Sequence, residues 1–219
     1  MRPIRSIALS TAVVLLAGGC AGASTSPAST GWTAPALPPA PTNVALREEL
    51  VRMHREDQAA REGLGAAMAA NDTTFAKRML AGDSLRSARL RTIVQQHGWP
   101  TPALVGRDGV DAAWFILQHS PSLELQRALL PAVETAARRG DMSMRDVAML
   151  TDRVLVREGK PQRYGHSFSV VDGKLVVDPV EDPARLDERR AAMGLRPMSE
   201  YVLVLRRAYE LPVVWPPQP

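Results

Sequence analysis

Two pairs of consecutive polar residues carry side chains whose chemistry could serve binding or catalysis. Gln118 and His119 follow a strongly apolar segment, and a neutral imidazole in such a place can act as a base or as a metal ligand. Asp152 and Arg153 lie in a segment with helical spacing, where neighbouring side chains do not face one another and each needs its own partner. A guanidinium there can hold a carboxylate or a phosphate with two hydrogen bonds. The plainer interpretations are a histidine that caps its helix and a buried ion-pair network.

A third group of polar residues alternates along the chain. Gln162, Tyr164 and His166 fall on the first strand of an expected hairpin, so their side chains should share one face. That face could line a cleft or lie in solvent. If it meets His119 and Arg153, the combined set is sufficient for acid–base work or ligand binding. The catalytic candidates are therefore His119, Arg153 and Tyr164, and the ligand-binding candidates are Gln118, Asp152, Gln162 and His166.

Other kinds of site find little support in the sequence. The chain has four histidines, and none occurs in an H-E-x-x-H motif. His54 and Asp57 lie one helical turn apart, a spacing that permits a metal-ligand pair but is common on charged helices. A G-x-S-x-G motif, a phosphate-binding loop and a dinucleotide-binding glycine pattern are all missing from the sequence. We therefore predict no metal site and no cofactor.

Helical periodicity dominates the chain after residue 42, and it predicts the elements that must position these residues. Ser143 and Asp146 form a capping box that begins one helix, and Asp172-Gly173 between β-prone runs indicates the hairpin. The expected fold is mainly α, with about six to seven helices and one β-hairpin in an α+β arrangement. Helices are expected over 43–62, 73–97 with a break at 82–83, 108–119, 120–139, 143–158, 182–193 and 199–209, and strands over 163–170 and 174–177.

The beginning of the chain resembles a bacterial lipoprotein leader. Arg2 and Arg5 precede an uncharged apolar run, 7–16, that is too short for a permanent membrane span. Ala17-Gly18-Gly19-Cys20 then resembles a lipobox, although that family usually has leucine three places before the cysteine. By this resemblance, residues 1–19 are a signal peptide and Cys20 carries the lipid. Cys20 is the only cysteine, so it cannot form an internal disulfide.

Two alternatives remain for the leader: ordinary cleavage after Ala23, which would remove Cys20, and an uncleaved anchor. The segment 20–41 is rich in proline and small residues and reads as a flexible spacer, in which the role of Trp32 is unexplained. A single domain is expected over 42–219. Because Ala21 follows the cysteine, resemblance to Gram-negative sorting rules implies, for a Gram-negative source, an exported protein on the outer membrane, at its periplasmic face.

The charge pattern bears on the possible partners. The formal net charge is +4, and two of the positive charges lie in the leader. Residues of both signs are interspersed after position 45, without a basic cluster, so the sequence disfavours nucleic acid as a partner. The expected partners are the membrane, through the lipid on Cys20, and an envelope protein or a small-molecule ligand.

A series of motifs resembles an uncharacterised bacterial domain-of-unknown-function family over most of residues 45–205. The resemblance implies no established activity. Where that family usually continues Tyr-Gly with Thr-Gln, this chain has His166-Ser167, which puts any function of that Thr-Gln pair in doubt here. The motifs are HGWP (97–100), LVG (104–106), AAW (112–114), QH (118–119), Gln126, LTDRV (150–154), GKPQRYG (159–165), EDP (181–183), Asp187, RR (189–190) and GL (194–195).

Two functional hypotheses follow from these observations. The first is an envelope lipoprotein whose helical domain binds a ligand or a protein, or serves as a scaffold. The second is an envelope enzyme, such as a hydrolase, that uses His119, Arg153, Gln162 and Tyr164. The departure at His166-Ser167 is easier to reconcile with a binding face than with a fixed catalytic apparatus.

Overall fold

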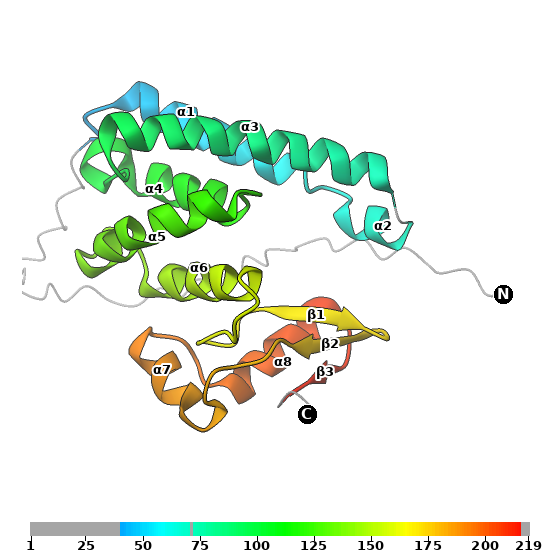
Figure 1. The fold of residues 1–219 in the computed structure, drawn as a ribbon. Helices are drawn as coiled ribbons and strands as arrows, with labels where there is room; N and C mark the ends of the chain where they lie inside the picture. The colour runs from blue at the N-terminus through cyan, green and yellow to red at the C-terminus, as the bar shows by residue number, and fades with distance from the viewer. Residues whose placement is uncertain (1–39, 71, 216–219) are drawn as a thin grey trace, which may run out of the picture. The chain divides into compact units, whose positions relative to one another are not determined.

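The computed structural model describes residues 40–70 and 72–215. It is mainly helical with one small sheet, which confirms the expected fold class (Figure 1). The leader, Cys20 and Trp32 lie outside the described residues. In chain order the elements are α1 (Val44–Ala59), α2 (Leu64–Ala69), α3 (Thr73–His97), α4 (Pro102–Gln118), α5 (Leu123–Arg138), α6 (Met144–Arg157), β1 (Phe168–Val171), β2 (Lys174–Val177), the 3-10 turn η1 (Pro183–Arg185), α7 (Leu186–Ala192), α8 (Met198–Tyr209) and β3 (Val213–Val214).

The helix α4 lies at the centre of the larger hydrophobic core. It contacts α1, α3 and α5, and α5 in turn packs along α6 (Figure 1). Apolar residues cover most of its circumference, as the sequence predicts for a central helix, and burying them supplies the main favourable term in folding. The α4 side chains buried in this core are Val105, Val110, Ala112, Ala113, Trp114, Ile116 and Leu117.

Several helix ends differ from the expected ones because side chains decide where a helix begins. Helix α4 starts at Pro102 and kinks at Gly106, whose φ of 73° is left-handed, so the expected start at Asp108 is the resumption after the kink. Helix α5 is capped by the Ser122 side chain, two residues beyond Ser120. The capping box of Ser143 and Asp146 is present at the start of α6, as predicted.

Two further expectations about helices were wrong. The helix α3 runs through Gly82 without a break, because the buried Asp83 bonds Arg61 and so holds this stretch against the segment that follows α1. The last helix begins at Met198, whose backbone N–H donates to the Asp187 carboxylate at 2.7 Å, and the Ser199 side chain does not cap it. Both differences depend on contacts between segments distant in the sequence.

The sheet contains one strand more than the hairpin. Strands β1 and β2 pair antiparallel in a register that matches Val171 with Lys174, so Asp172-Gly173 forms the expected two-residue turn. The short β3 near the end of the chain pairs parallel with β2. A second, smaller core lies between this sheet and the helices α7 and α8. It contains Leu175, Val177, Val180, Leu186, Met198, Val202, Leu205 and Val213.

The segment before β1 is a tight loop around a buried carboxylate, and not the strand 163–170 that alternation predicted. Asp152 of α6, fully buried, accepts hydrogen bonds from the backbone N–H groups of Arg163 at 2.8 Å, Tyr164 at 3.0 Å and His166 at 3.0 Å. Gly165 supplies the left-handed φ of 73° that this turn requires. The side chains of 162, 164 and 166 therefore do not share a strand face.

Gln162 also holds this loop in place. Its buried side-chain amide donates to the carbonyls of Ser167 and Asp178 at 2.8 and 2.9 Å, and its oxygen accepts from the Ser167 N–H at 2.7 Å. Because every polar atom of this amide has a partner in the loop or at the end of β2, Gln162 acts as an internal support for the loop.

Replacement of Asp152 by asparagine should destabilise the protein strongly. An amide offers one acceptor atom where the carboxylate offers two, and it turns an NH₂ toward backbone donors that then stay buried and unpaired. We expect a loss of about 3 kcal/mol in the free energy of unfolding, measured by urea denaturation. The control is Asp172→Asn, at an exposed turn residue whose φ of 48° asparagine tolerates. A loss for Asp152→Asn as small as that of the control would contradict the role given to this carboxylate.

Candidate functional site

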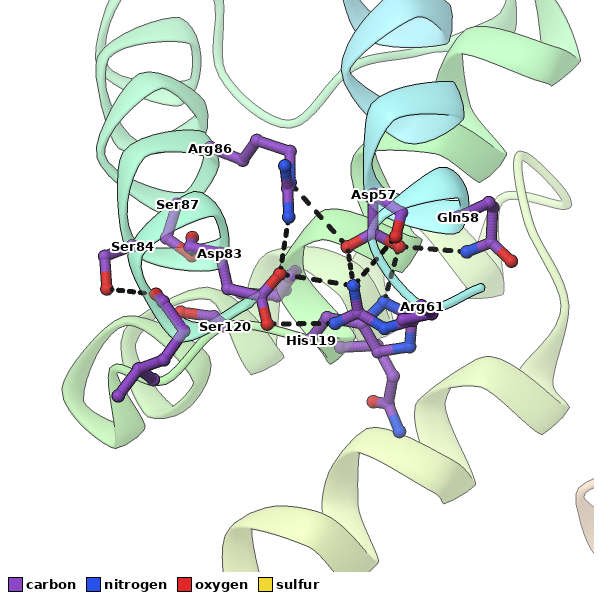
Figure 2. Close-up of polar contacts among 12 residues, drawn as sticks. Asp57, Gln58, Arg61, Asp83, Ser84, Arg86, Ser87, His119 and Ser120 are labelled. Atoms are coloured by element: carbon purple, nitrogen blue, oxygen red, sulfur yellow. Dashed lines mark hydrogen bonds and ion pairs between the residues drawn. The ribbon is translucent and has the colours of Figure 1, made fainter. Parts of the chain in front are cut away.

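A buried ion network joins the helices α1, α3 and α4 (Figure 2). Asp57 of α1 is fully buried, and its carboxylate bonds His119 Nδ1 at 2.8 Å and Arg61 Nη1 at 2.8 Å. The neighbouring Gln58 amide donates to the same carboxylate at 2.9 Å. Asp57 is therefore the partner that the helix-end histidine needs, and it lies far from that histidine in the sequence.

Asp83 of α3 completes the network. It accepts hydrogen bonds from Arg61 Nη2 at 3.0 Å and from Arg86 Nη2 at 2.7 Å, and Arg86 Nε lies 3.7 Å from Asp57 Oδ1 (Figure 2). Two carboxylates thus face two guanidinium groups, so these four charges balance in a place with little solvent. A balanced network of this kind is costly to break, because removing one partner leaves another charge buried without compensation.

The network decides which ring nitrogen of His119 carries a proton. Burial, the largest single influence, raises the pKa of Asp57, but the hydrogen bond and charge of His119 and the charges of Arg61 and Arg86 outweigh it and hold that pKa below its ordinary value. An ionised carboxylate only accepts hydrogen bonds, so His119 Nδ1 carries a proton. In the neutral imidazole Nε2 is then the acceptor, which is the arrangement of a histidine prepared to take a proton.

His54, which lies one helical turn before Asp57, packs against an aromatic ring. Its ring stacks on Phe115, with ring centroids 4.5 Å apart and planes at 8°. Burial is the main influence on the pKa of His54 and lowers it. The charge of Asp57 raises this pKa in part, and the charge of His119 lowers it further. Among residues 40–70 and 72–215, no three His, Cys, Asp or Glu side chains come close enough to hold a metal ion.

A separate pocket of about 500 Å³ lies among α6, α8 and the start of β1. Its volume is in the range of small-molecule sites. Three of the predicted residues, Gln118, Arg153 and His166, line it together. The remaining lining residues are Met149, Val156, Arg157, Ser167, Phe168, Ser169, Asp178, Tyr201 and Tyr209.

The guanidinium of Arg153 is the unusual group in this pocket. It forms no ion pair with any carboxylate in the described part of the chain, and its partner is the Gln118 side-chain oxygen, which accepts from Nε at 2.9 Å and from Nη2 at 3.3 Å when the amide is turned toward it. Burial, with the charges of Arg157 and Arg61, lowers the pKa of Arg153. Arginine nevertheless stays charged, so a partly buried positive charge lines the pocket.

A second guanidinium lies one helical turn further along α6. Arg157 donates to the carbonyls of Ser120 and Pro121 at 3.2 and 2.6 Å and to the Gln126 side-chain oxygen at 2.8 Å. All three acceptors are neutral, so its charge is not cancelled by these contacts. Two positive charges therefore face the pocket, and Asp178, bonded to Ser169 at 2.8 Å, is the acidic residue in its lining.

The other predicted residues lie elsewhere. Asp152 and Gln162 hold the 162–167 loop from inside, and Tyr164 packs against the larger core. His119 belongs to the Asp57 network and is not among the residues that line the pocket. The structure thus brings Gln118, Arg153 and His166 together in the lining of the pocket and places the other candidates outside that lining.

The family model for DUF6624, described as a family of unknown function, matches residues 44–214. The chain belongs to this family. The match spans α1 to β3, so both cores and the pocket fall within the DUF6624 domain. No curated protein and no solved structure matches the chain.

In the part of the chain that the structure describes, no helix combines the length and the apolar character needed to cross a bilayer.

The sequence analysis missed several residues of the pocket and of the network. Arg153 and Arg157 are spaced i, i+4 on one helix, so a second arginine on the same face was a readable signal. Tyr201 and Tyr209 enter the pocket from α8, and Asp57 reaches His119 across 62 residues of sequence. These last contacts depend on helix packing and have no local signature.

The pH dependence of stability should reveal the ionised Asp57. A carboxyl group whose folded-state pKa is depressed stabilises the fold above its unfolded value, ordinarily 3.8, and this contribution is lost as the pH falls through the lowered folded value. We therefore expect Asp57→Asn to cost on the order of 3 kcal/mol at neutral pH, and the difference from the original protein to shrink below about pH 3.8.

Urea denaturation across a pH series would measure this difference. Glu188→Gln serves as a control, because Glu188 forms an exposed ion pair with Arg185 that should contribute no more than about 1 kcal/mol. A difference for Asp57→Asn that stays constant down to pH 2 would show that this carboxylate is not held ionised.

Proposed function

We propose that this protein is an exported lipoprotein whose DUF6624 domain binds a small organic anion in the pocket lined by Arg153. The lipid on Cys20 would hold the protein on a membrane, and the segment 20–41 would let the domain reach its ligand from there. The lipobox resemblance supports the anchor, and the pocket supports the binding role.

The observation that carries the binding proposal is the Arg153 guanidinium. A charge of this kind is costly to bury without an opposite charge. In the described residues, the surrounding acidic side chains are engaged otherwise: Asp57 and Asp83 bond Arg61 and Arg86, and Asp152 bonds the 163–166 backbone. Asp178, in the lining itself, accepts a hydrogen bond from the Ser169 hydroxyl and forms no ion pair with Arg153. A ligand carboxylate or phosphate would supply the missing partner, and arginine can bind either group through two parallel hydrogen bonds.

The remaining lining suggests the body of the ligand. Hydroxyl groups of Ser167, Ser169 and Tyr201 can exchange hydrogen bonds with ligand hydroxyls, and the ring of Phe168 offers an apolar face. Burial raises the pKa of Tyr201, so its hydroxyl is a neutral donor. Polar groups around a partly aromatic pocket suit a hydroxylated anion, such as a sugar acid or a sugar phosphate.

The alternative proposal is an envelope hydrolase. The Asp57–His119 bond favours it, because a carboxylate that holds histidine Nδ1 leaves Nε2 available as a base. Its original set of His119, Arg153, Gln162 and Tyr164 reduces to the first two, since Gln162 and Tyr164 take part in the loop and the core. Hydrolysis of a chromogenic ester or phosphate ester that is lost in His119→Ala would favour the enzyme over the binding domain.

The binding proposal predicts stabilisation by carboxylated and phosphorylated sugars. In thermal unfolding of the protein, an anionic ligand at about 100 times its Kd should add ~2.7 kcal/mol of stability. The panel would contain sugar acids, sugar phosphates and peptidoglycan fragments, with the neutral parent sugars for comparison. Arg153→Gln should weaken binding by about 10- to 100-fold, because it removes a charge-assisted hydrogen-bond pair.

Arg127→Gln is the matched control, since it removes one positive charge from an exposed position outside the pocket. Arg153→Lys should fall between the two variants, because lysine keeps the charge and loses the planar pair of donors. Equal stabilisation by anionic and neutral sugars, or equal loss in Arg127→Gln, would refute the assignment.

The anchor proposal predicts a specific mature N-terminus. Intact-mass analysis of membrane-extracted protein should give a chain that begins at Cys20 and carries acyl mass, and Cys20→Ser should release the protein from the membrane. Stable attachment requires more than one acyl chain, so the added mass should correspond to several. A mature chain that begins at Ser24 without acyl mass would exclude lipidation.

A further inference from the structure

A second pocket, of about 610 Å³, is lined by three arginines from different parts of the chain. Arg145 comes from the first turn of α6, Arg190 from α7, and Arg196 from the segment between α7 and α8. Its remaining lining residues are His166, Ala191, Gly194, Leu195, Tyr201 and Val204. The lining contains no aspartate or glutamate, so its charges are all positive.

Arg190 is the most informative of the three. It is fully buried, its Nε donates to the Arg196 carbonyl at 2.7 Å, and its Nη1 donates to the Tyr164 carbonyl. Its Nη2 is buried with no hydrogen-bond partner among residues 40–70 and 72–215. Buried donors of this kind are rarely left unsatisfied in native proteins, and an unsatisfied one calls for a ligand or another explanation.

The positive charge of Arg190 also lacks an acidic partner. No carboxylate of the described residues forms an ion pair with it, and its guanidinium carbon lies 5.0 Å from the ring centroid of Tyr201, in a cation–π contact. Arg145 and Arg196 are exposed; Arg145 Nε donates to the Gly194 carbonyl at 2.8 Å, and neither side chain pairs with a carboxylate within the described ranges. Three guanidinium groups that form no ion pair within the described residues therefore surround one cavity.

We propose that this second pocket binds a phosphate monoester. A phosphate monoester carries about −1.5 to −2 charges near neutral pH and three acceptor oxygens, which suits three guanidinium groups better than a single carboxylate does. The apolar side chains of Leu195, Val204 and Ala191 would contact the organic part of the ester. The site is separate from the Arg153 pocket, with which it shares His166 and Tyr201 but no arginine.

The test uses butyl phosphate and inorganic phosphate as probes of the full chain. Side-chain Nε–Hε signals of arginine would be followed by NMR during titration, with those of Arg190 and Arg145 assigned by substitution. We expect saturable shifts of both signals, and about tenfold tighter binding of butyl phosphate than of inorganic phosphate, because the alkyl group is partly buried. Pentanoate, with the same apolar length and one charge, should bind more weakly than butyl phosphate.

Arg190 supports the fold as well, so the test relies on exposed positions. The double variant Arg145→Gln, Arg196→Gln should weaken butyl phosphate binding by at least about tenfold. The control variant Arg206→Gln, Arg207→Gln removes the same charge from exposed positions of α8 outside this pocket, and its affinity should stay within about twofold of the original.

Three results would overturn the proposal. One is an unchanged Arg190 signal at saturating butyl phosphate, and another is an equal loss of affinity in the control variant, which would indicate general charge attraction. The third is a response of the Arg153 signal alone, which would place the phosphate in the first pocket. That result leaves the proposed function intact, whereas failure of the sugar-acid binding described above leaves this second site intact.

Discussion

The buried carboxylate of Asp152 is the interaction on which the rest of the arrangement depends. It lies on α6, within the larger core, and it fixes the backbone at 163, 164 and 166, just before the chain enters the sheet of the smaller core. The loop in turn presents the Tyr164 carbonyl to Arg190 and sets His166 beside Tyr201, so one ion positions residues of both pockets.

The distribution of charge follows from how the acidic residues are used. Among the buried aspartates, Asp152 bonds backbone N–H groups, whereas Asp57 and Asp83 bond arginine side chains. Arg153 and Arg190 are instead held by neutral oxygens, of Gln118 in one case and of two backbone carbonyls in the other. Neutral acceptors fix the geometry of a guanidinium without cancelling its charge, which is a suitable starting state for a site that must attract an anion.

The network of Asp57 and His119 lies at another place in the domain. It ties α1 to the end of α4, immediately beside Gln118, the residue that orients Arg153. Because Gln118 and His119 are consecutive residues, the position of the His119 backbone affects the direction of the Arg153 side chain that Gln118 bonds. The family assignment to DUF6624 covers all of these residues, so the domain as a unit contains the network, the loop and both arginine-lined pockets.

The sequence by itself determined the elements whose signals are local. Helical spacing, the capping box of Ser143 and Asp146, and the Asp172-Gly173 turn predicted the class of fold and the hairpin, because each signal acts within a few residues. It also identified Gln118, Arg153 and His166, which share the first pocket.

Only the tertiary structure decided the rest. Alternation of Gln162, Tyr164 and His166 predicted a strand, but hydrogen bonds to the Asp152 carboxylate of α6 hold that backbone as a loop. The partner of His119 lies 62 residues away, and Arg145, Arg190 and Arg196 meet only after α6 and α7 are placed. Long-range burial and hydrogen bonding override local preference, because an unpaired buried charge or donor costs more than a strand propensity contributes.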